Sequence, residues 1–386
     1  MKPKLRFTEF NSDWNKTTLK NIAIINPKNE NIPDKFIYID LESVNKGILS
    51  QEKIISKSDA PSRAQRTVKK NDILFQTVRP YQQNNYFVKE IKDLSYVAST
   101  GYALIRTNEN PYFIYSILHK KDFLDKVIDR CTGTSFPAIS SNDLADININ
   151  IPDIQEQTKI SNFLSLIDKK IELQTKKIED LKLFKIYLNT RLFNNSKWNK
   201  VQLSEVLEIS NVRNKKNKYS KNDVLSVSDE FGVVNQIDLQ GRSFAAKDIS
   251  DYKIVSKDQI IYTRSPLSSK PYGIIKIVGN IEGIVSPLYI VNNVKKEFIP
   301  KFIYYLFDLP SSTNNYLRPL VRMGAKHTMN INDGEWLSGD IYAPSIDEQE
   351  KIVKIFEIIN KKIKVENNKL NKITELKKGL MQNMFV

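Results

Sequence analysis

The sequence contains one phrase twice: "PDIQEQTKI" at residues 152–160 and "PSIDEQEKI" at residues 344–352. The offset of 192 residues continues without a gap as far as Phe193 and Phe385. After each opening proline, a capping residue stands three positions before a glutamate, as Asp153 and Glu156 or as Ser345 and Glu348. This spacing is typical of a capping box at a helix N-terminus. We therefore predict that two helices begin at equivalent points of an internal repeat.

Both copies continue with a heptad pattern of apolar residues. The first seam comprises Ile160, Leu164, Ile167, Ile171, Ile178, Leu181, Leu188 and Leu192, and the second comprises Ile352, Phe356, Ile359, Ile363, Leu370, Ile373, Leu380 and Met384. Helices of about 40 residues exceed the ordinary length of about 11, and each would span roughly 60 Å. A helix of this length needs a partner along its seam, so we predict that the two copies pair as an antiparallel coiled coil.

Polar residues interrupt both seams at the same places, Gln174 and Lys185 in the first copy and Glu366 and Lys377 in the second. One antiparallel register about a pseudo-twofold axis sets Lys185 opposite Glu366 and Gln174 opposite Lys377. A shift by one heptad keeps the apolar seam as well, so this register is a hypothesis. The predicted pairing residues are Ile171, Gln174, Ile178, Leu181, Lys185, Leu188, Ile363, Glu366, Leu370, Ile373, Lys377 and Leu380.

The segments before the helices repeat more faintly. "NDILFQTVRP" at 71–80 resembles "KDQIIYTRSP" at 257–266, and Trp14 corresponds to Trp198. Short β-rich runs, at 72–75 and 272–278, alternate with single helices at 111–118 and 300–309. We predict an α+β fold of two related globular domains, each followed by a long helix. The segments are 1–152, 153–194, 195–344 and 345–386.

The composition favours a polyanionic partner. The formal charge is +15, from 59 Lys and Arg against 44 Asp and Glu, and nucleic acid is the commonest polyanion in a cell. A lysine excess alongside abundant asparagine and isoleucine is also what AT-rich codons produce. No apolar run approaches the roughly 18 residues of a membrane span, and the first residues lack a secretory signal. We expect a cytoplasmic protein.

The usual catalytic motifs are missing from the sequence. It has no G-x-x-x-x-G-K-[ST] loop for ATP, and neither a glycine-rich turn nor an Asn-Pro-Pro-aromatic motif for S-adenosylmethionine. Two histidines, His119 and His327, and one cysteine, Cys131, stand in no metal or nucleophile pattern. We therefore expect that the chain carries no metal ion and no catalytic residue. Its role would be to bind and recognise a partner molecule.

The repeated Pro-x-Ile-x-Glu-Gln-x-Lys-Ile phrase, the Asp-Ile-Leu-Phe run from Asp72, and "GTSFPAIS" from Gly133 resemble the DNA-specificity subunit of Type I restriction-modification systems. The resemblance covers essentially the whole chain. In the second half, "GAKHTMNIN" from Gly324 departs from the Gly-Thr-Ser-Phe-Pro pattern.

The resemblance implies a division of labour. Each globular domain would be a target-recognition domain that reads one half of a bipartite, asymmetric sequence in double-stranded DNA, and the paired helices would set the spacer. Two methyltransferase subunits would dock on the helices, bind S-adenosylmethionine and methylate a flipped adenine. Restriction subunits would supply ATP- and Mg-dependent cleavage, and this chain itself would carry no cofactor.

Arg reads guanine and Asn or Gln reads adenine in the major groove, so polar loops beside strands are the candidate contacts. Each of these residues can equally be a solvated loop residue. In the first domain they are Arg63, Arg66, Arg79, Tyr81, Gln82, Gln83 and Asn84, with Gly133, Thr134 and Ser135 added by the resemblance. In the second they are Arg242, Arg264, Ser268, Lys270, Arg318, Arg322, Lys326 and His327.

Two other classes of protein remain open on the sequence. A coiled-coil adaptor with two protein-binding heads explains the repeat and the missing active site, but it explains the basic charge less well. A DNA enzyme with an unrecognised site would show methylation or cleavage by the chain alone. A steep loss of duplex affinity with rising salt would count against the adaptor.

Overall fold

The structure is a computed structural model that describes residues 2–195, 197–323 and 329–386. The chain forms two compact units: Met1–Thr175 with Asn368–Val386, and Lys176–Asn367. The boundary in each long helix falls at the same position of the 192-residue repeat, after Thr175 and after Asn367. Each unit therefore contains one globular head, half of the first long helix and half of the second.

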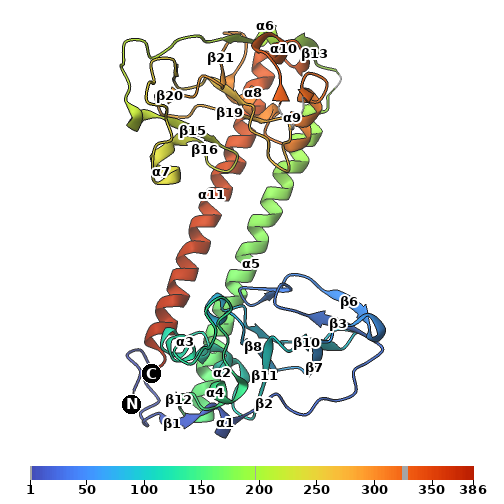
Figure 1. Cartoon of the computed structure of the whole chain (residues 1–386), viewed down its shortest axis with the longest axis vertical. Helices are drawn as coiled ribbons and strands as arrows, with labels where there is room; N and C mark the ends of the chain where they lie inside the picture. The colour runs from blue at the N-terminus through green and yellow to red at the C-terminus, as the bar shows by residue number, and fades with distance from the viewer. Residues whose placement is uncertain (1, 196, 324–328) are drawn as a thin grey trace. The chain divides into compact units, whose positions relative to one another are not determined.

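The first unit opens with a small α+β head (Figure 1). Its strands are β1 (Asn15–Thr18), β2 (Ala23–Ile25), β3 (Lys35–Ile39), β4 (Val44–Asn45), β5 (Ile48–Leu49), β6 (Lys53–Ser56), β7 (Ala64–Val68), β8 (Ile73–Gln76), β9 (Tyr86–Phe87), β10 (Tyr96–Ser99), β11 (Tyr102–Thr107) and β12 (Asn148–Ile151). Its short helices are α1 (Leu19–Ile22), η1 (Lys57–Asp59), η2 (Pro80–Gln82), α2 (Pro111–Ile117), α3 (Lys121–Ile128) and α4 (Ser141–Ala145). The long helix α5 (Ile154–Phe193) follows β12 directly.

The second head repeats this plan with more hairpins. Its strands are β13 (Asn199–Gln202), β14 (Leu207–Ile209), β15 (Leu225–Ser228), β16 (Gly232–Asn235), β17 (Lys253–Val255), β18 (Ile260–Thr263), β19 (Ile274–Ile277), β20 (Gly283–Val285), β21 (Ile290–Val294), β22 (Arg322–Met323), β23 (Met329–Asn330) and β24 (Asp340–Ala343). Its short helices are α6 (Leu203–Val206), η3 (Lys221–Asp223), α7 (Gln236–Gln240), α8 (Pro300–Leu306), α9 (Pro310–Leu317) and α10 (Asp333–Leu337). The long helix α11 (Ile346–Asn383) follows β24.

Two sheets have the same strand order in both units. The four-stranded sheet β2-β11-β8-β9 of the first unit corresponds to β14-β21-β18-β19 of the second, and the pair β1-β12 corresponds to β13-β24. The remaining sheet differs, because β6-β3-β10-β7 in the first unit is replaced by the separate pairs β15-β16 and β17-β20. The α+β fold with two related heads is thereby confirmed, and the divergence is concentrated outside the shared sheets.

The long helices pair antiparallel within each unit. In the first unit, Ile160 and Leu164 of α5 share one core cluster with Leu380 and Met384 of α11. In the second unit, Leu188 and Leu192 of α5 pack in one cluster with Ile352 and Phe356 of α11. The residues that meet in the two clusters occupy equivalent positions of the repeat, and all of them are apolar. These contacts confirm the coiled-coil prediction.

The predicted register is wrong by about one heptad. Glu366 forms an ion pair with Lys177, at 3.1 Å, instead of lying opposite Lys185. In the first unit Lys377 pairs with Asp168, at 2.5 Å, instead of Gln174. The alternative shift preserves the apolar seam, and it also brings the ends of both helices into the two head cores. Lys185 is released from the seam and pairs with Asp308 beside α8, at 2.7 Å.

The predicted capping residues begin both long helices, but the two glutamates have other partners. The Asp153 carboxylate accepts from the backbone N–H of Glu156 at 2.9 Å, as an N-cap does. The buried Glu156 carboxylate accepts two bonds from the Arg6 guanidinium, each at 2.7 Å. Glu348 instead accepts from the Trp198 indole N–H at 3.1 Å. Each glutamate thus ties the start of its own head to the long helix.

One head helix is shorter than its sequence suggests. The prediction of a helix over 300–309 is wrong, because α8 ends at Leu306 and α9 starts at Pro310. A proline disfavours helical geometry in the preceding residue, so the chain turns at 307–309. The turn places Asp308 beside α5, where it meets Lys185.

Candidate DNA interface

The first head places an arginine three residues past the end of the inner strand β8. Arg79 adopts a left-handed conformation, with φ 52° and ψ 54°, and caps the short helix η2. Its backbone N–H donates to the Pro137 carbonyl at 2.7 Å. Its guanidinium Nε is buried and finds no hydrogen-bond partner among the described residues. A buried donor without a partner is costly unless a ligand satisfies it, so Arg79 is a candidate contact residue.

A small hairpin packs against Arg79. Thr132 and Ala138 exchange two backbone hydrogen bonds, at 2.9 and 3.0 Å, and close a turn that contains Gly133 at φ 90°. An isolated bridge joins Ala138 to Val78, next to Arg79. The Phe136 ring lies under the guanidinium, 4.3 Å from its centroid to the Arg79 carbon Cζ. The structure thus brings Arg79 together with Gly133, which the sequence had placed in one site only through the family resemblance.

A buried amide holds the loop between β8 and β9. The Gln76 side chain donates to the Val78 carbonyl and to the Gln82 side chain, both at 2.8 Å. It also accepts from the Asn84 N–H at 3.0 Å. Asn85 is buried next to it and accepts from the Gln76 N–H at 2.8 Å. The loop is therefore fixed from inside, which reduces the entropy lost when it binds a ligand.

The other predicted residues of the first head are spread over two regions. Tyr81 and Gln82 are exposed and Gln83 and Asn84 half-buried in the loop after Arg79, and Thr134 and Ser135 are exposed on the hairpin. Arg63 is exposed in the turn before β7, in the other sheet. Arg66 lies within β7, where its Nε donates to the Tyr102 carbonyl at 2.8 Å and burial lowers its pKa. Part of the Arg66 guanidinium is thus already engaged within the head.

The second head also places an arginine after its central strand, β18. The Nε of Arg264 is buried and has no partner among the described residues, while the other end of its guanidinium is 3.4 Å from the Asp333 carboxylate. Arg322 on β22 is exposed and lies 3.5 Å from Glu335. These four side chains line a pocket of about 630 Å³. Arg264 and Arg322 are therefore brought together, each facing one carboxylate of the α10 region.

The structure places Lys270, a predicted DNA contact, inside the second head and not on its surface. Lys270 is buried, and its ammonium donates to the Asp229 carboxylate at 2.6 Å and to the Asp308 carbonyl at 3.4 Å. Lys276 is also buried and pairs with Asp229 at 2.9 Å. Burial alone would raise the pKa of Asp229, but the bonds from the two lysines outweigh it and hold this pKa below its ordinary value. The ion pair of Lys270 with Asp229 therefore holds the end of the loop between β18 and β19 inside the second head.

The remaining predicted residues of the second head do not form one cluster with Arg264. Arg242 is exposed after α7, with its guanidinium carbon 4.6 Å from the Phe244 ring centroid. Ser268 is exposed in the loop after β18, and Arg318 is exposed at the end of α9. Lys326 and His327 lie outside the described residues.

Exposed apolar residues on the long helices repeat at equivalent positions. In the first unit, Leu166, Leu173 and Leu376 are 70%, 55% and 57% exposed. Their counterparts, 192 residues away, are Ile358, Val365 and Phe184 in the second unit, at 66%, 43% and 49%. None of these residues belongs to the heptad seam along which the two long helices are predicted to pair. Each unit thus presents these three apolar positions to solvent, and Ile154 and Ile346 form a fourth exposed pair at equivalent positions.

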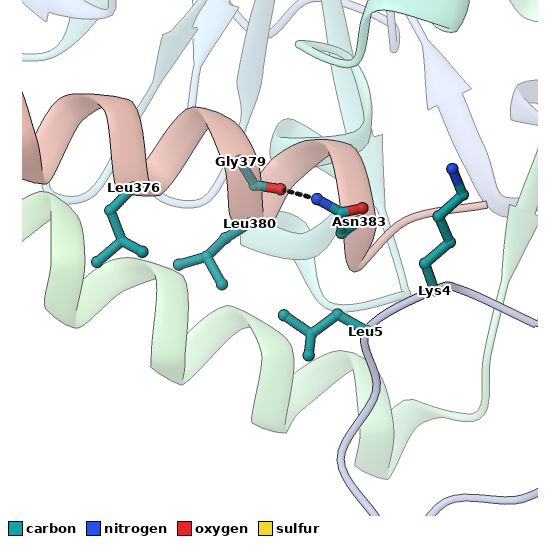
Figure 2. Close-up of a pocket in the computed structure, with 6 residues that line it drawn as sticks. All are labelled: Lys4, Leu5, Leu376, Gly379, Leu380 and Asn383. Carbon is teal, nitrogen blue, oxygen red and sulfur yellow. Dashed lines mark hydrogen bonds between the residues drawn. The ribbon is translucent and has the colours of Figure 1, made fainter.

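A small apolar pocket of about 360 Å³ lies where the N-terminal segment crosses the end of α11. Figure 2 shows Leu5, Leu376 and Leu380 around it, with the Asn383 side chain bonded to the Gly379 carbonyl at 2.7 Å. Gly379 has Tyr187 as its counterpart in the first copy of the repeat. The absence of a side chain at this position leaves room there. Lys4 is the one charged residue among those that line the pocket, and the other lining residues do not include the acid–base or nucleophilic groups of a catalytic site.

Within the described residues, no group of three or more His, Cys, Asp or Glu side chains is placed to hold a metal ion. Cys131 is half-buried, its Sγ donates to the Val127 carbonyl at 3.3 Å, and burial raises its pKa. A thiol in this state is a poor nucleophile. Across the same residues, every helix is too short or too polar to cross a membrane.

Comparison with known families agrees with this arrangement. The model of the Type I restriction modification DNA specificity domain matches the chain twice, at residues 11–183 and 195–375. This chain belongs to that family. Each match contains one complete head and part of the long helix that follows it. The DNA-specificity role of the family therefore applies to both halves of this subunit.

Curated relatives carry the same description. The specificity subunit of Type I restriction enzyme HindI from Haemophilus influenzae is 30% identical over 177 residues, which is 42% of this chain and 37% of that protein. The MjaVIII specificity subunit from Methanocaldococcus jannaschii is 22% identical over 380 residues, covering 91% of this chain and 82% of that protein. The chain thus aligns with just over a third of the HindI subunit's length.

Solved structures share the fold over the whole length. The S subunit of a Type I restriction-modification system from M. genitalium has a TM-score of 0.58 at 16% identity, over 100% of this chain and 99% of that one. A chain from work on complex assembly and conformational transition of the type I R-M system also scores 0.58, at 18% identity, over 98% of both chains. These likenesses establish the two-headed fold of the specificity subunit.

Sequence reasoning missed two features of the site. Phe136 stands in the quoted "GTSFPAIS" motif, but its stacking on Arg79 depends on a contact between residues 57 positions apart. The tie between Asp229 and Lys270 joins two loops separated by 41 positions. β18 is buried throughout and β19 nearly so, and the apolar residues of these two strands are the local signal that the loop between them lies close to a core.

Proposed function

We propose that the two heads of this specificity subunit each read one half of a bipartite, asymmetric target in double-stranded DNA. One observation carries the proposal. Both heads place an arginine with a buried Nε, without a partner among the described residues, just after an inner strand of equivalent sheets: Arg79 is three residues past the end of β8, and Arg264 directly follows β18. The loops around the two arginines differ in almost all of their residues. Such a difference is expected if the same fold recognises a different DNA sequence in each head.

The chemistry of the two sites suits duplex DNA. Arginine is the commonest side chain that reads guanine in the major groove, where it binds O6 and N7 together. Neighbouring loop amides such as Gln82 and Gln83 match adenine, and exposed cations such as Arg322 match phosphate. The overall charge of +15 adds sequence-independent attraction to the duplex. The family match and these loops favour DNA over the adaptor hypothesis.

The antiparallel helices are the spacer element of the proposal. A repeat that places equivalent seam residues in each head core fixes both heads to the same pair of helices. The length of α5 and α11 would then set how many base pairs separate the half-sites. Insertion or removal of one heptad in both helices is expected to change the spacer of the target and to leave both half-sites unchanged.

The partners of the proposed complex are two methyltransferase subunits and, through them, restriction subunits. Two copies are proposed because the exposed apolar positions occur once per unit, at Leu166 and Leu173 and again at Ile358 and Val365. S-adenosylmethionine would bind to the methyltransferase subunits, and ATP with Mg²⁺ to the restriction subunits. This chain would have no catalytic residue of its own and would act in the cytoplasm.

The test is binding of the purified complex of this chain with its methyltransferase to a pool of random duplexes. Selection and sequencing are expected to enrich one motif with two fixed blocks and a fixed gap. Affinity for that motif is expected to fall as salt rises, with a slope of about 0.9 per neutralised phosphate. Enrichment of no motif, together with affinity that is independent of salt, would favour the adaptor.

A further inference from the structure

Phe136 is the most exposed aromatic side chain on the loops of the first head. The residue is 63% exposed although a phenylalanine gains free energy by burial. Neighbouring Tyr81, on the loop after Arg79, is also 51% exposed. Apolar rings that stand out of a fixed loop are unusual on a free surface, and they are typical of a surface that binds a partner.

Hydrogen bonds hold the backbone of the turn that carries Phe136. Its turn is closed on both sides by the Thr132–Ala138 bonds, and the Arg79 N–H donates to the Pro137 carbonyl beside it. A Cβ on Gly133 would lie 3.2 Å from the Phe136 carbonyl oxygen, so this turn also needs its glycine. The Arg79 guanidinium covers one face of the ring. Most of the residue nevertheless remains exposed to solvent.

The apolar groups of duplex DNA that a ring can reach from the major groove are the thymine 5-methyl groups, and phenylalanine is one of the side chains that contacts them. We propose that Phe136 is a specificity-determining residue that packs its ring on the 5-methyl group of one thymine in the half-site read by the first head. Arg79 holds the ring in place and supplies a positive charge next to the same base step. The inference rests on the proposed function.

A thymine is available in every such half-site. The partner methyltransferase is proposed to methylate adenine, so each half-site contains at least one A·T pair. In the second head, the sequence has His327 in place of the phenylalanine at the position that corresponds to Phe136. The proposed contact is therefore a property of the first head alone, and it should affect one half-site only.

The experiment uses the complex of the full chain with its methyltransferase and the duplex motif found by selection. Each thymine of each half-site is replaced in turn by uracil, which removes only the 5-methyl group, and affinity is measured by fluorescence anisotropy at fixed salt. For the natural chain we expect about fourfold weaker binding at one position of the first half-site, the value for one buried carbon group. The variant Phe136→Ala should bind thymine and uracil equally at that position.

Two further variants separate this contact from other effects. Phe136→Leu keeps an apolar side chain and is expected to keep a reduced uracil penalty. Phe244→Ala removes the ring stacked on Arg242 in the second head and should leave the first half-site penalty unchanged. Because Phe136 is exposed, its variants should unfold at the same temperature as the natural chain, and this is measured alongside.

The outcomes distinguish the inference from the function beneath it. A natural chain that binds its motif specifically but shows no uracil penalty in the first half-site overturns the role of Phe136 and leaves the function standing. If Phe136→Ala shows the same loss of affinity for uracil as the natural chain, the role of Phe136 is likewise overturned and the proposed function stands. A chain for which no specific motif exists overturns the proposed function itself.

Discussion

Gln157 and Gln349 form the same pair of hydrogen bonds in the two units. The Gln157 amide donates to the Pro152 carbonyl at 2.9 Å and accepts from the Asn110 N–H, the N-cap of α2, at 3.1 Å. Gln349 donates to Pro344 at 3.1 Å and accepts from Ile299, the N-cap of α8, at 3.0 Å. Both amides are buried. In each unit the glutamine joins the start of the long helix to a head helix. This shared structural role explains why the Glu-Gln pair occurs in both copies although the heads differ.

Replacing Gln157 with alanine should destabilise the first unit. The change leaves the Asn110 N–H and the Pro152 carbonyl without their hydrogen-bond partner. We expect this to lower the free energy of unfolding by about 1–3 kcal/mol. Hydrogen exchange of the α2 and β12 amides is expected to accelerate, while exchange in the second unit stays unchanged. Gln155→Ala, at an exposed position of α5, is the matched control. Equal exchange rates in the two variants would contradict this role of Gln157.

Lys270→Met should weaken the second head without acting as a lost DNA contact. The variant removes one of two ammonium groups on Asp229, and a lost hydrogen bond to a charged group costs about 1.5–3 kcal/mol. The free energy of unfolding is measured by denaturant titration, with the exposed Lys257→Met as control. The salt slope of DNA binding should not change for Lys270→Met. A decrease of about 0.9 would show a phosphate contact instead.

The helix register is tested by a double-mutant cycle on Lys177 and Glu366. The ion pair at 3.1 Å joins a half-exposed lysine to a buried carboxylate, so we expect a coupling energy of about 0.5–1 kcal/mol. The cycle on Lys185 and Glu366 should give no coupling, because Lys185 pairs with Asp308. Coupling in the second cycle and none in the first would restore the register predicted from the polar seam positions.

Acid should destabilise the first unit through His119. Burial lowers the pKa of His119 to about 4, and its ring nitrogens lie 2.8 Å from the Tyr115 carbonyl and 3.4 Å from the Asn85 amide. The unfolded chain binds a proton below about pH 6.5 and the folded chain does not, so stability falls as the pH drops from 6.5 toward 4.

Because solvent still reaches part of the His119 residue, we expect a loss on the order of 1 kcal/mol between pH 6.5 and 5. His119→Gln, which cannot titrate, should flatten this part of the profile of unfolding temperature against pH. An identical slope in the variant would assign the acid sensitivity to carboxylates such as Asp229.

The features that repeat in the sequence could be predicted from it. Features that depend on contacts between distant residues could not. The helix starts at Asp153 and Ser345 and the seam through Ile178 follow from local spacing, and the structure places them as expected. The register does not follow, because two alignments one heptad apart bury the same seam and only packing into the heads selects between them. Lys270 was misplaced for the same reason: its burial depends on Asp229, which a sequence pattern cannot bring to it.

The most direct test of the central claim is a map of methylated adenines in the native genome. The map is made with the gene intact, with the gene deleted, and with Arg79→Ala in its place. We predict that deletion removes methylation from one bipartite motif, and that Arg79→Ala relaxes or removes recognition of one half of that motif while the other half is still required. Methylation that persists unchanged without the gene, while the partner methyltransferase is active, would contradict the account.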